Sequence, residues 1–249
     1  MTANEMGVLL ELKLDRSSSF GSPGYEDFEL TSVLTEAEYL FVKKFIDRKN
    51  NRKGESFEET EVRNQGLSAL IKRGAMLPVS SDQTGTLTNG KFYDLPEFFM
   101  YTILEEAGID KTDCDDNNII ADIRVIGHDE VSRFKRNKYK KPYFKPYDEA
   151  LVWRLVFSRE IDGYLDISTR TSKRHQLVTD GTFDVSNYSI NYLRSPKGII
   201  VDSNVVGNQR NSILDDSTHD TIVDIAVSLM LERVKEKELV NIEGFKDLE

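Results

Sequence analysis

Apolar positions recur at helical spacing near both ends of the chain and at strand-like spacing between them. Up to Gly74 they follow capping boxes, in which a Ser or Thr and a Glu three residues later bond free backbone N–H groups of a first helical turn. This pattern predicts a helix after each box and a short helix over 25–34, with polar turns at 17–24 and 50–54. The third helix is predicted to end at Arg73, because glycine is favoured just after a helix. The boxes are Thr2 with Glu5, Thr35 with Glu38, and Ser56 with Glu59.

The middle of the chain has the spacing of short strands. Aromatic or apolar segments alternate there with turn residues, and the segment Leu-Val-Trp-Arg-Leu-Val-Phe at 151–157 is typical of a strand buried on most of its surface. Further strands are predicted over 119–126 and 188–192, with a hairpin over 159–167 and a short helix within 127–137.

Helical spacing returns at Ser217. Apolar residues then lie along one face of a helix predicted to reach about Leu239, and Ser217 and Asp220 can cap its first turn. Each amphipathic helix needs a partner for its apolar face, and the N-terminal helices are the natural partners of the last one. The predicted fold class is therefore α+β. Residues 1–75 and 217–249 form a helical bundle, and 76–216 form a large β-rich insertion.

Composition limits the protein classes. Hydrophobic residues make up 39% of the 249 residues, which is enough for a core in one large domain or two small ones. No apolar run approaches the roughly 20 residues that span a bilayer, and no basic-then-apolar leader opens the chain, so we expect no membrane partner. The single cysteine, Cys114, excludes an internal disulfide and a zinc site built from cysteines.

Charge is unevenly distributed. The chain carries −10, but the run from Arg133 to Lys145 carries +7 with no acid, so the remainder carries −17. Such a run is often only a solvated face. Its interleaved aromatic residues still make it the best candidate for an interaction surface, either docking onto an acidic protein or gripping phosphates and stacking on bases. The acidic total favours docking. The candidate interface residues are Arg133, Lys135, Arg136, Lys138, Tyr139, Lys140, Lys141, Tyr143, Phe144 and Lys145.

The sequence offers no convincing catalytic motif. Residues 85–92 nearly match a phosphate-binding loop, but Phe92 stands where a magnesium-bound hydroxyl is needed, so a hairpin turn is predicted. Asp113, Asp115 and Asn117 have the spacing of a calcium loop that lacks its final Glu. No histidine pair has metal-ligand spacing. We therefore expect no enzyme activity, no cofactor and no metal.

Several stretches together resemble the head–tail connector, or ring, proteins of tailed phages, and those of crAss-like phages in particular. The resemblance implies a non-enzymatic virion protein of the head–tail neck, made in the bacterial host cytoplasm. It also implies a ring of identical subunits, a dodecamer by that resemblance, that contacts the portal protein and the next connector or tail protein. Genomic DNA would pass through the lumen without sequence-specific binding. The stretches are MTANEM, SPGYEDFELTSVLTEAEYLFVKKF, VIGHDEVSRFKRNKYKKPYFKPYDEALVWRL, YSINYLRSPKGIIVD and STHDTIVDIAVSLMLERVKE.

Two other functions remain open from the residues alone. The first is a module that binds single-stranded nucleic acid or a host factor through the basic run, which salt-sensitive oligonucleotide binding would reveal. The second is a hydrolase with an acid pair that no motif identifies, which turnover of a defined substrate would reveal.

Overall fold

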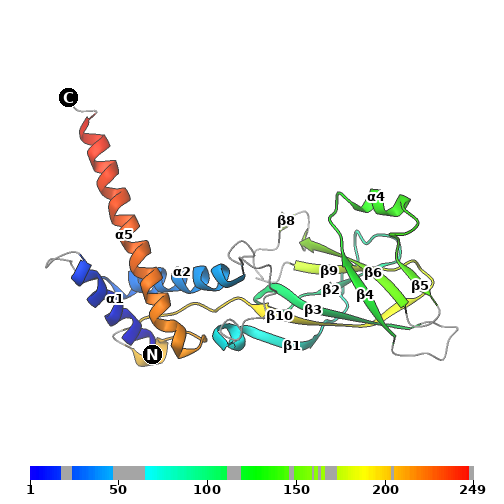
Figure 1. Cartoon of the computed structure of the whole chain (residues 1–249), viewed down its shortest axis with the longest axis horizontal. Coiled ribbons are helices and arrows are strands. Elements are labelled where there is room, and N and C mark those ends of the chain that lie inside the picture. The colour runs from blue at the N-terminus through cyan, green and yellow to red at the C-terminus, as the bar shows by residue number, and fades with distance from the viewer. Residues whose placement is uncertain are drawn as a thin grey trace. The chain divides into compact units, whose positions relative to one another are not determined.

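The protein has an α+β fold with helices and one large curled β-sheet, seen in the computed structural model in Figure 1. By its internal contacts the chain divides into two units, Met1–Leu70 with Ser195–Glu249, and Ile71–Arg194. We call these the helical unit and the β unit. The structure describes residues 1–17, 24–46, 65–110, 119–145, 149–158, 160–161, 164–165, 173–202 and 205–246.

Within its described residues, the helical unit contains three long α-helices that contact one another: α5 packs against both α1 and α2, and α1 touches α2. Two short 3₁₀ helices and a helical turn at 65–67 complete the helical elements of its described part. The bounds are α1 Ala3–Ser17, α2 Asp27–Ile46, α5 Asp216–Lys246, η2 Ser68–Leu70 and η3 Val206–Asn208.

The first predicted capping box is confirmed. The backbone N–H of Thr2 donates to Glu5 Oε2 at 2.8 Å, and the backbone N–H of Glu5 donates to Thr2 Oγ1 at 3.3 Å. Behind this cap, Met6, Leu10 and Leu14 are buried at helical spacing. Helix α1 therefore begins where the sequence predicts and faces the core with the predicted side.

The second predicted capping box is wrong, because 25–34 and the residues after Thr35 form one continuous helix, α2. Thr35 Oγ1 donates to the carbonyl of Ile199 at 2.9 Å instead, and buried Glu38 accepts a hydrogen bond from Ser212 Oγ at 2.6 Å. Both side chains form hydrogen bonds with a distant segment of the chain. Neither therefore caps a new helix at this point.

That distant segment follows the last strand and packs on the helices. The backbone N–H of Val201 donates to Thr31 Oγ1 at 2.9 Å, and Ile199 and Val201 are buried. The sequence pattern assigns 195–216 to the β-rich part, whereas its contacts group 195–216 with the helices. Two threonines on α2 hold it there by completing backbone hydrogen bonds that a sheet would otherwise provide.

The predicted third helix is wrong at its C-terminal end. Residues 65–67 are helical and lead into η2, but the chain then extends as β1, Ile71–Met76. Lys72 and Arg73 lie in this strand rather than in a last helical turn. Gly74 has φ +64° and its N–H donates to Asn191 Oδ1 at 2.7 Å, so the glycine serves a strand irregularity rather than a helix end.

The β unit is built on an eight-stranded sheet within its described residues, in the order β1-β10-β3-β4-β6-β9-β2, with β5 paired to β6. Strand β4 runs parallel to β6, and the other pairs are antiparallel. A separate pair, β7 with β8, confirms the predicted hairpin. The remaining bounds are β2 Gly90–Asp94, β3 Phe99–Asp110, β4 Ile119–Val125, β5 Tyr143–Lys145, β6 Glu149–Ser158, β7 Glu160–Ile161, β8 Tyr164–Leu165, β9 Lys173–Val178 and β10 Asp184–Arg194.

Both faces of β6 are buried, as its continuous apolar sequence predicts. Val152 joins a large core inside the curled sheet, whereas its neighbour Trp153 joins a smaller core on the opposite face. The short helix α4, Val131–Arg136, contributes Phe134 to that second core. The predicted short helix therefore forms and covers the outer face of the sheet.

The phosphate-loop-like segment is a turn, as predicted. Asn89 has φ 60° and the N–H of Gly90 donates to the carbonyl of Leu87 at 2.9 Å, after which β2 begins. Helix α5 also forms, although it continues to Lys246 beyond the predicted end near Leu239. Asp215 rather than Ser217 caps it, by accepting the N–H of Ser217 at 3.0 Å. Other predictions lie outside the described residues: the turn at 50–54, the box of Ser56 and Glu59, and the acidic loop with Cys114.

Candidate interaction surface

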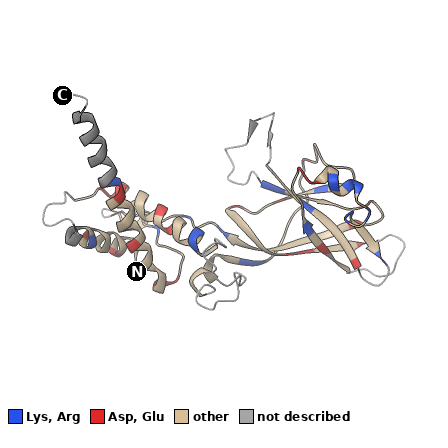
Figure 2. Ribbon diagram, turned by 45° about the horizontal axis from the view of Figure 1, so that its top comes forward, with Lys and Arg blue, Asp and Glu red and all other residues tan. Residues whose placement is uncertain are grey.

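The candidate interface residues lie on α4, on the turn that follows it and on β5, all within the β unit. Figure 2 shows the Lys and Arg residues of α4 in blue. We call the set from Arg133 to Lys145 the basic surface. Strand β6 fixes the backbone of this surface through Trp153. The Trp153 and Phe134 rings lie 6.3 Å apart, and Trp153 Nε1 donates to the Lys140 carbonyl at 2.9 Å. The run is therefore a built surface rather than a free tail.

Not every cation of the basic surface is available to a partner. Arg133 pairs with Glu130, and Lys145 Nζ lies 2.7 Å from Glu149 Oε2, a hydrogen bond that raises the pKa of Lys145. The Lys140 ammonium lies 4.6 Å from the centre of the Phe134 ring. Four cations remain exposed with no ion pair to any described residue. They are Lys135, Arg136, Lys138 and Lys141.

The aromatic residues of the run have different roles. Tyr139 is 89% exposed and projects into solvent. Phe144 instead packs against the large core, and Tyr143 is half-buried with the Lys145 ammonium 4.7 Å from its ring centre. Tyr139 is thus the aromatic side chain of the basic surface that can insert into another molecule. Phe144 and buried Pro142 instead pack within the β unit.

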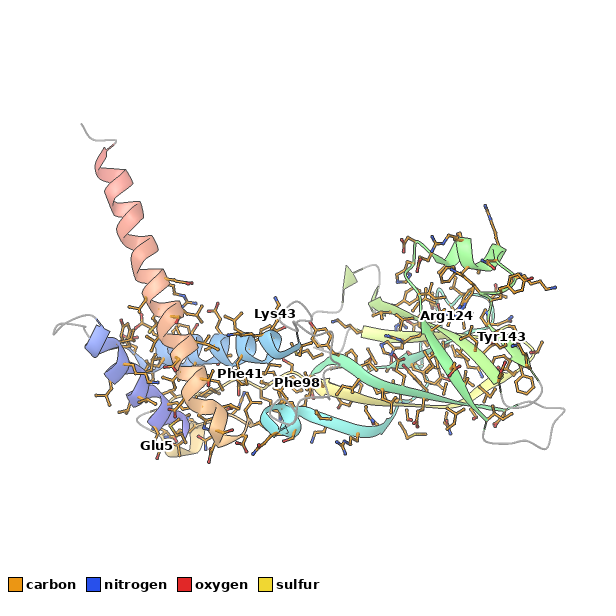
Figure 3. The ribbon with its side chains drawn as sticks, in the orientation of Figure 1. Glu5, Phe41, Lys43, Phe98, Arg124 and Tyr143 are labelled. Atoms are coloured by element: carbon orange, nitrogen blue, oxygen red, sulfur yellow. The ribbon has the colours of Figure 1, made fainter. Side chains whose placement is uncertain are left out.

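One cation near this surface comes from another strand. Arg124 is exposed on β4 directly beside Trp153 of β6, on the same face of the sheet as α4. Figure 3 labels Arg124 together with Tyr143 of β5. The sequence gives no hint of this proximity, because Arg124 follows a strongly acidic stretch. Only the parallel pairing of β4 with β6 brings it beside the basic surface.

A second polar group lies buried inside the curled sheet. Arg154 Nη1 donates to His175 Nε2 at 3.0 Å, which leaves the proton of a neutral imidazole on Nδ1 to donate to the Tyr188 hydroxyl at 2.7 Å. The Tyr188 hydroxyl donates to Glu105 Oε2 at 2.8 Å, and that oxygen lies 3.0 Å from Arg154 Nε. We call these four residues the buried polar ring.

Burial dominates the electrostatics of the buried polar ring. It lowers the pKa of His175 to about 3, with the Arg154 charge adding to the effect, so His175 is neutral at pH 7. Burial also raises the pKa of Glu105, although Arg154 and Tyr188 oppose the shift, and raises the pKa of Tyr188. The residues come from β3, β6, β9 and β10, so the ring ties together strands far apart in the sheet order.

The described parts of the molecule show neither a metal site nor a phosphate-binding loop. Their residues contain no group of three or more His, Cys, Asp or Glu side chains that could hold a metal ion. Lys91 lies on β2 with its ammonium 3.3 Å from Asp184, and Phe92 is buried, so this segment does not form a phosphate cradle. No helix in the described ranges is long and apolar enough to cross a membrane.

Comparison with known proteins identifies the family. Residues 1–238 match the family described as phage tail ring protein 3/4. The chain belongs to this family. It is also similar to a protein named ring protein 4/5 from Bacteroides phage crAss001, with 24% identity over 201 residues that cover 80% of this chain and 75% of the relative.

Family membership makes this protein a structural component of a phage ring or tail, located in the virion. The predicted resemblance to ring proteins of crAss-like phages is confirmed. Membership in a ring protein family also implies assembly into an oligomer with other phage structural proteins. A surface built for protein contacts is therefore the kind of functional site to expect here.

Proposed function

We propose that this ring protein forms a closed ring of identical subunits in the head–tail neck, below the portal, around a passage for the genome. The basic surface docks each subunit onto a neighbouring subunit or onto the portal protein. Membership in a ring protein family, matched over residues 1–238, is the observation that supports the ring. Four exposed cations of the basic surface form no ion pair with any described residue, and on a chain of net charge −10 this local excess supports docking onto acidic protein surfaces.

Docking onto protein is favoured over binding DNA for a physical reason. Each phosphate that a cation neutralises adds to the affinity for DNA, and a passage that holds the genome tightly would slow its movement. The helical unit, with α1, α2 and α5 packed together, acts as a connector-like bundle in this proposal. The proposal includes no catalytic step, since the function is assembly.

The decisive test separates folding from assembly. The double variant Lys138→Glu and Lys141→Glu keeps Lys140, whose ammonium lies against Phe134. We expect its circular dichroism and melting to match the wild type, while the mass of its complexes falls to that of the monomer, alone or mixed with the portal protein of the same genome. Lys72→Glu with Lys173→Glu is the matched control, because both lysines are exposed elsewhere in the β unit.

Single-stranded nucleic acid is the second candidate partner, and one observation favours it. Tyr139 is 89% exposed between lysines, as in surfaces that stack bases. A titration of a labelled oligonucleotide at several salt concentrations distinguishes the two functions. Normal assembly of the Lys138→Glu, Lys141→Glu variant together with lost, salt-sensitive oligonucleotide binding would replace docking by nucleic-acid binding.

A further inference from the structure

A groove opens between α2 and α5 of the helical unit. Its volume is about 230 Å³, and its apolar lining comes from Tyr25, Phe28, Val33 and Met230. An apolar cavity of about 150 Å³ holds a benzene molecule, so this groove has room for one aromatic ring. Phe28 of this lining is 78% exposed, so the groove presents an aromatic ring to solvent.

The rim of the groove is acidic. Glu29 lines it directly, and its carboxylate accepts the backbone N–H of exposed Glu26 at 3.3 Å. Glu11 lies next to the groove residue Tyr25 and accepts its backbone N–H at 3.4 Å. The single cation of the lining, Arg233, pairs with Glu36. The groove therefore presents the Glu29 carboxylate, with Glu26 next to it, beside a partly aromatic apolar lining.

The basic surface has the opposite properties. Tyr139 is a fully projecting aromatic ring, and exposed Lys138 and Lys141 flank it. A tyrosine with neighbouring cations complements an aromatic groove with a carboxylate rim in shape, polarity and charge. Because the two surfaces belong to different units of the same chain, a contact between copies is heterologous, and such contacts generate closed rings when the rotation closes.

We propose that Tyr139 of one subunit inserts into the α2–α5 groove of the next subunit, with Lys138 and Lys141 facing Glu26 and Glu29. This inference rests on the ring proposed above, and it specifies which two surfaces build the ring. The occupant of the groove is thus a second copy of this chain. Aromatic side chains in such pockets are commonly the residues that dominate an interface.

Cross-linking between different subunits tests the contact directly. Cys114, the only cysteine, is first replaced by serine, and Tyr139→Cys and Phe28→Cys are then placed in two separate chains that are co-expressed. We expect a short bismaleimide to link the two chains into a covalent heterodimer. Tyr39→Cys replaces Phe28→Cys as the control, because Tyr39 is an exposed aromatic residue on the same helix outside the groove.

Charge reversal tests the energetics. Lys138→Glu with Lys141→Glu, and separately Glu26→Lys with Glu29→Lys, should each weaken self-association by about tenfold or more, and combining the four changes in one chain should recover most of the loss. Recovery distinguishes a direct contact from two independent effects, because only facing charges regain attraction when both are reversed.

The outcomes separate this inference from the proposed function. Efficient 139-to-28 linkage and recovery by the fourfold variant support the inference. Rings of normal mass with no linkage above the Tyr39→Cys control would overturn the inference and leave the ring function intact. A wild-type protein that stays monomeric, alone and with the portal protein, would overturn the proposed function and this inference with it.

Discussion

The carboxylate of Glu105 and the guanidinium of Arg154 lie 3.0 Å apart inside the curled sheet, although β4 separates their strands in the sheet order. Both side chains are largely buried, at 13% and 11% exposure. Their pairing, with His175 and Tyr188 completing the buried polar ring, holds the two sides of the curled sheet together. The β unit thus carries a buried ionic group at the centre of its core.

Arg154→Ala should lower the free energy of unfolding by about 3 kcal/mol, because it leaves Glu105 buried without a counter-charge. Urea unfolding measures the change. Lys145→Ala is the control, since it removes only an exposed ion pair with Glu149 and should lower the stability much less. Equal losses in the two variants would show that the buried pair does not stabilise the fold through charge.

His175 should make stability depend on pH below neutrality. The unfolded chain protonates this residue near its ordinary pKa of 6.5, whereas the folded chain holds the pKa at about 3. The free energy of unfolding therefore falls as the pH drops from 6.5 towards 3, by up to about 1.4 kcal/mol per unit. The raised pKa of Glu105 acts with the opposite sign, since its contribution to stability grows as the pH falls.

Urea unfolding at pH 7 and pH 5 measures this dependence in the wild type and in His175→Gln. The variant removes the titrating group, so its loss of stability between the two pH values should be smaller than that of the wild type. A wild type whose stability is unchanged or higher at pH 5, with the same slope in the variant, contradicts the assignment of a neutral buried His175.

Ala226→Asp should unfold or strongly destabilise the helical unit. Ala226 is fully buried on the face of α5 that meets the other helices, and an unpaired buried charge costs several kcal/mol. Ser228→Asp lies on the exposed side of the same helix and should change stability by less than about 0.5 kcal/mol. Leu229→Asp should fall between them, because Leu229 is half-buried. Thermal melting followed by circular dichroism ranks the three.

ATP should be neither bound nor hydrolysed. Lys91 lies on a strand beside Asp184, and buried Phe92 follows it in place of a hydroxyl residue, so no helix N-terminus receives phosphates. Phosphate release in the presence of magnesium and ATP should not exceed the buffer rate. Turnover that Lys91→Ala abolishes would show that the segment at 85–92 acts as a phosphate-binding loop after all.

Local patterns in the sequence predicted much of the architecture. The cap of Thr2 and Glu5, the buried face of α1, the apolar strand β6 and the helix α5 all depend on residues a few positions apart. Such short-range relations are visible in a sequence because helix and strand periods are fixed by backbone geometry. The basic surface was found the same way, since its cations are consecutive in the chain.

Contacts between distant residues decided the rest. Thr35 and Glu38 form a good capping box by local rules, yet Ile199 and Ser212 engage both side chains and α2 continues through them. Lys72 and Arg73 lie in a strand because β1 pairs with β10, more than a hundred residues later in the chain.

The sequence by itself determined the cap and buried face of α1, the apolar strand β6, the presence of helix α5, where charge accumulates and which family the chain resembles. Tertiary structure alone decided that Phe144 packs inward while Tyr139 projects, that Arg124 joins the basic surface, and that Glu105 meets Arg154. The physical reason is that strand order and register select these neighbours. Each strand can pair with several others by its own pattern, and only the packing of the whole sheet chooses among them.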